Sequence, residues 1–189
     1  PTKQIAVGDV LVGGDAPISV QSMTKTDTRD INATVSQIKG LEEVGCEIVR
    51  CAVPDIDAAK ALKSIKQKVK IPIVADIHFH YQLALESLKA GVDCLRLNPG
   101  NIRDRSKVEL IVKEAKQREV PIRIGVNFGS LPPVGKIGLT RGGSRHKDGV
   151  NKLPKEGEAG ESYTIVDHMV QTGLWEISIL EDLDFDLIK

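Results

Sequence analysis

The sequence predicts an α/β protein with the fold of a TIM-type (β/α)8 barrel, incomplete, in which about six strands follow an N-terminal hairpin. Short apolar runs alternate with segments of helical periodicity, as expected for parallel strands joined by crossover helices. Polar or charged residues lie toward the carboxyl end of nearly every run, which suits a barrel because all of its strand ends border one mouth. No Gly-x-Gly-x-x-Gly follows the first strand, so the main sequence signal for a dinucleotide-binding doubly wound sheet is absent.

Length and composition favour one truncated, cytoplasmic barrel domain. The chain has 189 residues, fewer than the ~250 of a typical TIM barrel. Basic and acidic residues both number 26 and only 3% of residues are aromatic, which disfavours nucleic acid as a partner. No apolar run reaches the ~20 residues of a membrane span, and no signal-peptide pattern is present. Three cysteines without paired spacing argue against a secreted disulfide scaffold.

The strands are predicted from the apolar runs and the turns that bound them. Residues 1–14 are expected to form a hairpin around a Gly8-Asp9 turn. Residues 15–127 are expected to hold the first five βα units. Their predicted strands are residues 17–23, 47–53, 71–77, 94–98 and 121–127.

The helices between these strands are predicted from apolar residues at helical spacing and from capping signals. The first and second helices follow Asp30 and Asp55, whose carboxylates can cap a helix N-terminus. The third helix, residues 81–90, stops at Gly91. Asp104 is expected to cap the fourth.

The pattern changes after the fifth strand. Residues 128–161 are rich in Gly, Pro and basic residues, so we expect a flexible loop, which could fold over an anionic ligand or touch nucleic acid. Residues 162–189 are expected to form a helix with Ser162 as its cap, followed by a sixth strand that begins at Phe185. The apolar spacing of this helix is carried by Tyr163, Val166, Met169, Val170, Gly173, Leu174 and Ile177.

Three arginines share one position in their strands. Arg50, Arg96 and Arg123 all lie toward the carboxyl end of an apolar run, and burying them together is costly unless an anion meets them. Their planar guanidinium groups suit a phosphate or carboxylate, and a diphosphate would engage all three. The alternative is that they form structural salt bridges with Asp76, Asp93 and surface carboxylates.

Asp76 and His78 are the candidate catalytic residues. They are two apart in one strand and therefore lie on the same face, where they could act as acid and base or fix a substrate hydroxyl. The alternative for His78 is an ordered core histidine. His80 is expected to begin a helix, and His168 is expected at the surface.

Four uncharged side chains are further candidates for substrate binding. Asn98 and Asn127 share the parity of the arginines on their strands, and their amide groups can orient the oxygen atoms of a ligand. Gln21 and Met23 share one parity at the end of the first strand. We assign all four to the same site.

Five motifs carry a resemblance to a known family. They occur in unbroken order over about residues 4–131, and the chain resembles the 4-hydroxy-3-methylbut-2-en-1-yl diphosphate synthases of the IspG/GcpE type. The motifs are Val20-Gln-Ser-Met-Thr24, Glu47-Ile-Val-Arg50, Ala75-Asp-Ile-His-Phe79, Leu95-Arg-Leu-Asn-Pro-Gly100, and Ile122-Arg-Ile-Gly-Val-Asn127 followed by Gly129-Ser-Leu131.

The resemblance implies a TIM barrel that binds 2-C-methyl-D-erythritol 2,4-cyclodiphosphate at its mouth, in the methylerythritol phosphate route to isoprenoids. It implies that Arg50, Arg96 and Arg123 grip the diphosphate and that Asp76 contacts the substrate. It also implies a homodimer and a reduced ferredoxin or flavodoxin as electron donor. Asn98 and Asn127 are the matching asparagines.

The sequence departs from the family pattern in three ways. It stops at Lys189, where an Ile-Ser-Leu-Lys-like motif would begin, and the remaining barrel strands are missing. The family's C-terminal domain, which holds a [4Fe–4S] cluster on three cysteines and one glutamate, is missing too, and Cys46, Cys51 and Cys94 do not match those ligands. We therefore expect these cysteines to be small buried residues and the chain alone to be inactive.

Two other readings remain open. The chain could belong to another phosphate-binding TIM-barrel enzyme, such as a pterin-binding synthase, whose site also lies at the strand ends. It could also be a non-catalytic barrel fragment that associates with itself through an exposed sheet edge.

Overall fold

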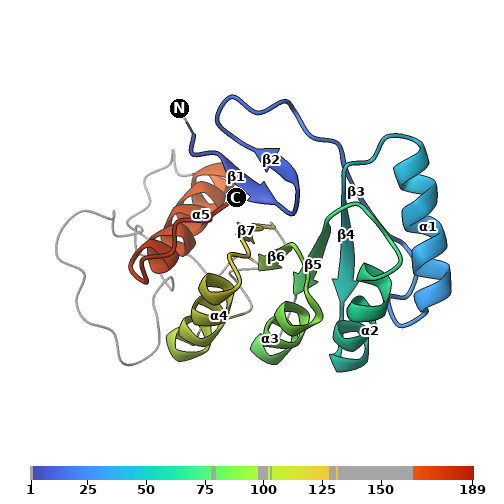
Figure 1. Cartoon of the computed structure of the whole chain (residues 1–189). Helices are drawn as coiled ribbons and strands as arrows, with labels where there is room; N and C mark the ends of the chain where they lie inside the picture. The colour runs from blue at the N-terminus through green and yellow to red at the C-terminus, as the bar shows by residue number, and fades with distance from the viewer. Residues whose placement is uncertain (1, 78–79, 98–101, 103, 128–130, 132–163) are drawn as a thin grey trace.

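The computed structural model describes residues 2–77, 80–97, 102, 104–127, 131 and 164–189 (Figure 1). Its main sheet has five parallel strands that neighbour one another in chain order. They are β3 (Gln21–Met23), β4 (Ile48–Val53), β5 (Ile73–Ile77), β6 (Cys94–Leu97) and β7 (Ile122–Ile124). Ile188 pairs in parallel with Ile122 on the far side of β7, so the predicted sixth strand begins here. The α/β barrel-type order is confirmed.

The first four helices form a single layer, because α2 contacts both α1 and α3, and α3 contacts α4. A doubly wound sheet would divide them between two faces. The helices are α1 (Ile31–Glu43), α2 (Ile56–Lys66), α3 (Tyr81–Ala90) and α4 (Arg105–Gln117).

Local capping chemistry sets the ends of these helices. The Asp30 carboxylate accepts from Ala33 N at 3.0 Å, and Asp55 and Asp104 cap α2 and α4 in the same way. Gly91 ends α3 with φ of 85°, a left-handed conformation that glycine adopts without steric cost. The roles predicted for Asp30, Asp55, Gly91 and Asp104 at the ends of these helices are confirmed.

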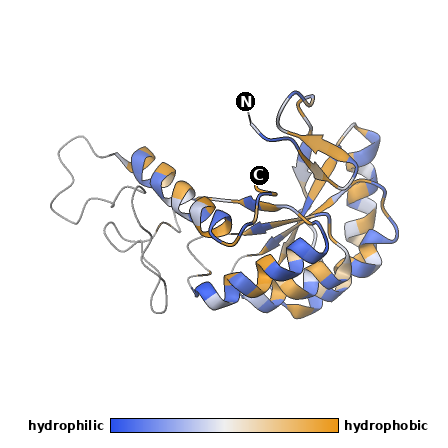
Figure 2. Cartoon of the chain, turned by 60° about the vertical axis from the view of Figure 1, so that its left-hand side comes forward, coloured by the Kyte–Doolittle hydropathy of each residue, from blue (hydrophilic) through white to orange (hydrophobic). Residues whose placement is uncertain are grey.

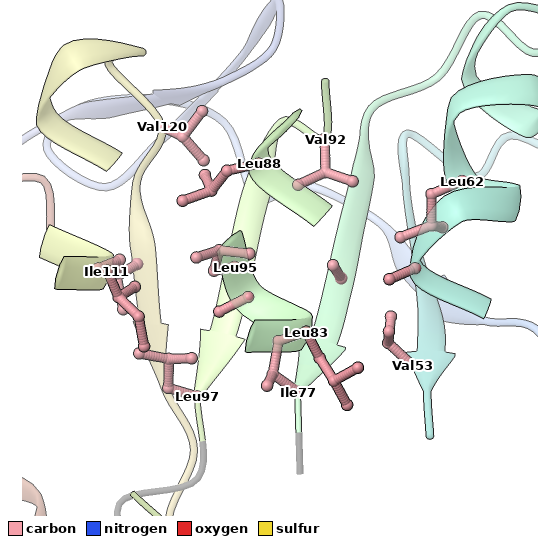
Figure 3. Packing of buried hydrophobic residues seen from close by; sticks show 14 of the residues in the cluster. Val53, Leu62, Ile77, Leu83, Leu88, Val92, Leu95, Leu97, Ile111 and Val120 are labelled. Carbon is pink, nitrogen blue, oxygen red and sulfur yellow. The ribbon is translucent and has the colours of Figure 1, made fainter. Parts of the chain in front are cut away.

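The larger core lies between the helices and the outward face of the sheet (Figure 3). Ile77 and Leu95 from the strands lie against Leu83 and Leu88 of α3, and all four side chains are buried. Burying a side chain of this size contributes about 1.5–3 kcal/mol. This face therefore fixes the strands in place and leaves the other face available for function.

The other face of the sheet is apolar only at its amino end. There β1 (Ile5–Val7) and β2 (Val10–Val12) form the predicted antiparallel hairpin. Val7 packs with Ile48, Val74 and Cys94 in a second buried cluster. The hairpin therefore covers the amino end of this face.

The predicted first strand, residues 17–23, is too long. Only Gln21–Met23 is strand, and the Ile18 side chain before it is 98% exposed. In the described part of the chain β3 is the edge of the sheet, so this segment has a partner on one side only. Val44, predicted on the buried face of α1, is exposed beyond the end of that helix.

The predicted last helix is present, but its cap differs from the predicted one. α5 spans Ile165–Glu181 and is capped by Thr164 in a capping box with Asp167, whereas the predicted cap Ser162 lies outside the described residues. Figure 2 shows both hydrophobic and hydrophilic residues along α5, and the apolar series that predicted this helix is partly exposed. Its exposed members are Val166, Val170 and Leu174, whereas His168, Thr172 and Glu176 are buried.

His168 was predicted at the surface, and this prediction is wrong, because the side of α5 that carries His168 faces the protein. None of the helices in the described residues is long and apolar enough to cross a membrane.

Candidate functional site

The strand register places three of the predicted site residues in one row. Asp76 pairs with Arg96, and Arg96 pairs with Arg123. Paired residues of neighbouring strands project from the same face, so these three side chains lie on the inner face, above the apolar cluster under the hairpin. Arg50 pairs with Met23 one inward-facing position lower on the same face. The sheet therefore assembles the predicted residues from four strands and β3.

Asp76 is the centre of this charged layer. Its side chain is buried, with a residue exposure of 2%. One carboxylate oxygen accepts from Arg96 Nη1 at 2.8 Å, and the other lies 3.3 Å from Arg50 Nε. The salt-bridge alternative is thus correct for Arg50 and Arg96. Three guanidinium groups around one carboxylate nevertheless leave the layer with an excess of positive charge.

Among the described residues, the other side-chain hydrogen bonds of Arg50 and Arg123 are with neutral side chains. Arg50 Nη2 donates to Met23 Sδ at 3.1 Å, and thioether sulfur is a weak acceptor. Arg123 Nη1 donates to Gln21 Oε1 at 3.2 Å. Burial, together with the charges of Arg50 and Arg96, lowers the pKa of Arg123. Within the described residues no carboxylate forms an ion pair with Arg123, so an anion would be stabilised beside it.

Arg96 has an unused donor. Its residue exposure is 6%, and its Nε is buried without a hydrogen-bond partner among the described residues. Leaving such a donor unsatisfied costs about 1–3 kcal/mol or more. Arg96 Nη2 also lies 3.5 Å from the carbonyl oxygen of Gly125. The guanidinium is therefore tightly confined and suited to accept an anionic ligand.

Gly125 is a site residue that the sequence analysis missed. A Cβ atom there would lie 2.5 Å from Arg96 Nη2 and 2.6 Å from its Cζ, closer than real contacts allow. The absence of a side chain therefore makes the space for the Arg96 guanidinium. An isolated glycine at the end of a strand pattern indicates close approach of another group, and that signal was available in Ile122-Arg-Ile-Gly.

Other predicted site residues are placed less completely. His78 and Asn98 lie outside the described residues. Asn127 is exposed just beyond β7, and its role stays a prediction. Asp93, a candidate partner of the arginines, instead accepts from Lys66 Nζ at 2.5 Å and from Ile73 N at 2.7 Å. It therefore does not neutralise the inner-face arginines.

The three cysteines are free and buried, as predicted. Cys51 lies in the outer core and Cys94 in the cluster under the hairpin, on opposite faces of the sheet. Burial raises the pKa of Cys51 to about 11 and that of Cys94 to about 12, so both are neutral thiols. These cysteines do not converge and do not fit an iron–sulfur cluster. In the described part of the chain no group of three His, Cys, Asp or Glu side chains could hold a metal ion.

Comparison with known proteins gives one consistent result. A family model described as the GcpE TIM-barrel domain matches residues 2–189. The chain is 59% identical over 186 residues to 4-hydroxy-3-methylbut-2-en-1-yl diphosphate synthase (flavodoxin) from Dehalococcoides mccartyi, covering 98% of this chain and 47% of that protein. It is 52% identical over 188 residues to the protein of the same name from Thermodesulfovibrio yellowstonii, covering 100% of this chain and 48% of the relative. The chain thus spans about half the length of these relatives.

One solved structure supports the fold alone. The 7,8-dihydropteroate synthase from Vibrio fischeri superposes with a TM-score of 0.59 at 14% sequence identity, covering 99% of this chain and 65% of that one. At this identity the likeness says nothing about the ligand of the present site.

Proposed function

The chain belongs to the GcpE TIM-barrel domain family, and from this premise we propose that it is the substrate-binding barrel portion of a reductive enzyme of isoprenoid biosynthesis. The proposed reaction of the whole protein converts 2-C-methyl-D-erythritol 2,4-cyclodiphosphate to 4-hydroxy-3-methylbut-2-enyl diphosphate. The observation that carries this proposal is the inner-face layer in which Arg50, Arg96 and Arg123 surround the single carboxylate of Asp76. Such a layer requires an anionic ligand to offset its charge.

The proposed roles follow from the contacts. Among the described residues, Arg96 has a buried Nε without a hydrogen-bond partner, and the side chain of Arg123 donates to the neutral Gln21, so we propose that both bind phosphate oxygens. Asp76 orients Arg50 and Arg96 and, with His78, is the proposed acid/base pair or the contact to a substrate hydroxyl. Asn98 and Asn127 belong to the same proposed binding set, as do Gln21 and Met23.

The reductive part of the reaction is assigned to the rest of the longer protein. A [4Fe–4S] cluster supplies electrons one at a time when bound, and we propose that its ligands lie in a C-terminal domain outside this chain. The relatives' names contain flavodoxin, which supports flavodoxin as the donor. A ferredoxin is the other donor that the family resemblance implies. A homodimer in the cytoplasm completes the proposal, and the three free cysteines are in keeping with that compartment. We expect this chain alone to be inactive.

A pterin-binding synthase is the less favoured alternative. The only support in the structure is the shared fold with dihydropteroate synthase, whereas relatives at 59% and 52% identity carry the diphosphate synthase name. Pterin diphosphate is therefore the discriminating ligand.

The test is a thermal-shift titration of the full chain with the cyclodiphosphate and, separately, with pterin diphosphate. At 100 times Kd the cyclodiphosphate should stabilise the protein by about 2.7 kcal/mol. Arg96→Ala should abolish the shift, whereas Arg118→Ala, which removes an exposed arginine at the end of α4, should retain it. A shift with pterin diphosphate alone, or one that Arg96→Ala leaves intact, would contradict the proposal.

A further inference from the structure

A lysine to which the sequence analysis assigned no role faces the interior of the barrel. Ile122 N donates to Leu187 O at 2.9 Å, and Lys189 N donates to Ile122 O at 3.0 Å. Ile124 N in turn donates to Lys189 O at 3.1 Å. These bonds place Lys189 directly opposite Arg123, and opposite residues of paired strands share a face. Lys189 therefore continues the row of Asp76, Arg96 and Arg123.

The surroundings of Lys189 support this placement. Burial lowers its pKa, and the positive charge of Arg123 lowers it further, so the two cations lie within electrostatic reach of each other. Cys94, on the neighbouring inner face, is the other titratable group that faces Lys189, and its thiol is neutral because burial raises its pKa to about 12. Two adjacent cations repel each other, so the free protein holds unfavourable electrostatic energy here.

The charged layer is divided into two unequal halves. Arg50 and Arg96 share the Asp76 carboxylate, which partly neutralises them. Among the residues that the structure describes, neither Arg123 nor Lys189 forms an ion pair with a carboxylate. Among these residues, the positive charge without a carboxylate partner therefore lies at the β7 and sixth-strand end of the layer.

A cavity of about 760 Å³ opens beside this end. Its walls include apolar residues of the hairpin and of the segment before β3, and its polar or charged side chains are Ser19, Gln21, Arg123 and Lys189. This volume is in the range of small-molecule sites, which are mostly apolar with a few placed polar groups. Both cations line this cavity and are thus accessible to a ligand that enters it.

We propose that Lys189 and Arg123 form a second phosphate subsite, which binds one phosphate of a diphosphate ligand while Arg96 and Arg50 bind the other. An anion between Lys189 and Arg123 removes the repulsion of two unpaired cations, and lysine binds phosphate as a point charge beside the planar arginine. The inference rests on the proposed function, because it assigns a further residue to the same diphosphate site.

The subsite is tested by isothermal titration calorimetry of the full chain with inorganic diphosphate. Lys189→Gln should weaken binding by about 10- to 100-fold, the range expected for loss of one charge-assisted contact. Lys189→Arg should stay within a few-fold of wild type, and Lys113→Gln, which removes one exposed lysine from α4, should bind like wild type. If Lys189→Gln binds diphosphate with the affinity of wild type, the proposed subsite is wrong.

Two further comparisons make the result specific. Because Lys189 has a lowered pKa and arginine does not titrate, wild-type affinity should fall more steeply than that of Lys189→Arg as pH rises from 7 to 10. Titration of diphosphate itself is common to both proteins, so identical profiles would contradict the proposal. If Arg96→Ala abolishes binding while Lys189→Gln has no effect, the subsite is wrong and the proposed function stands. If wild type binds neither diphosphate nor the cyclodiphosphate, both the subsite and the proposed function are contradicted.

Discussion

At the scale of single residues, the site depends on the partners that its charged side chains have among the described residues. The Asp76 carboxylate fixes two guanidinium groups that would otherwise sample many rotamers. The buried donor of Arg96 and the neutral partner of Arg123 then leave capacity for a ligand. Removing Asp76 would therefore both raise the positive charge and disorder the groups that carry it.

Gly125 is the sharpest test of this arrangement. In Gly125→Ala the new Cβ would overlap the Arg96 guanidinium, so Arg96 must leave its position beside Asp76. We expect diphosphate affinity to fall at least about tenfold, the loss of one charge-assisted contact, in calorimetric titration. Gly40→Ala is the matched control, because nothing lies within 4 Å of a Cβ atom there and alanine favours α1. Equal affinity in both variants would show that Arg96 has room to move.

Glu176 is a second residue whose environment predicts a measurable effect. It is 7% exposed on α5, its Oε1 has no hydrogen-bond partner among the described residues, and burial raises its pKa to about 8. The folded state therefore prefers the protonated acid. Stability is fully present below the unfolded pKa near 4.5 and is lost as pH rises through about 8.

Glu176→Gln should remove this dependence. At pH 8.5 the variant should be more stable than wild type by up to a few kcal/mol in urea unfolding, and the difference should shrink toward pH 5. Glu181→Gln, on the exposed side of the same helix, should show no such trend. A constant difference across pH would mean that Glu176 has the same pKa in the folded and unfolded states, so that burial does not raise it.

At the scale of elements, the hairpin covers the amino end of the inner face, below the charged layer of the site. Its Val7 side chain is fully buried against Ile48, Val74 and Cys94, directly below the charged layer. Apolar packing at one end of the interior thus excludes water from beneath Arg50, Asp76 and their neighbours. Exclusion of water lowers the local dielectric constant and so strengthens the electrostatic interactions in the charged layer.

Val7→Ala should therefore destabilise the protein by about 1–3 kcal/mol, because it leaves a cavity in a closed cluster. The measurement is the free energy of unfolding in urea. Val44→Ala, at a site that is 79% exposed, should change stability by less than about 0.5 kcal/mol. Equal effects in both variants would mean that the hairpin is not held by its buried valine.

Elements differ in how far the sequence determines them. The caps at Asp30, Asp55 and Asp104 were predictable because capping is local, and the third helix was predicted to the residue because Gly91 ends it. Strand parity was enough to place Arg96 and Asp76 on the same face of the sheet, whereas their ion pair was only the alternative to ligand binding by Arg96.

The remaining features depend on tertiary neighbours. Apolar spacing shows that α5 is amphipathic, but only packing decides that Val170 faces outward and Thr172 inward. The length of β3 depends on which strands flank it, and Asp76 is shared by two arginines through side-chain geometry that no spacing encodes. For Gly125 the signal was present, yet the group that approaches it comes from another strand.

At the scale of the whole molecule, the described strands form an arc rather than a closed barrel. β3 pairs only with β4, and the chain that leads into it exposes Ile18 and Val20. An exposed strand edge flanked by apolar side chains is a template for pairing with another chain. The 189-residue chain should therefore associate with itself through this edge at high concentration.

Analytical ultracentrifugation over a range of concentrations tests this expectation. Because Ile18 is 98% exposed, association through the β3 edge would bury it, and such burial is worth about 1.5–3 kcal/mol per side chain. Ile18→Lys should therefore raise the dissociation constant by about tenfold or more, since 1.4 kcal/mol corresponds to a factor of ten. Val44→Lys, an exposed valine beyond the end of α1, should leave it unchanged. Two outcomes would contradict this expectation: a chain that stays monomeric at every concentration, or equal effects of Ile18→Lys and Val44→Lys. In either case Ile18 would contribute no contact energy between molecules, and the β3 edge would not be the site of association.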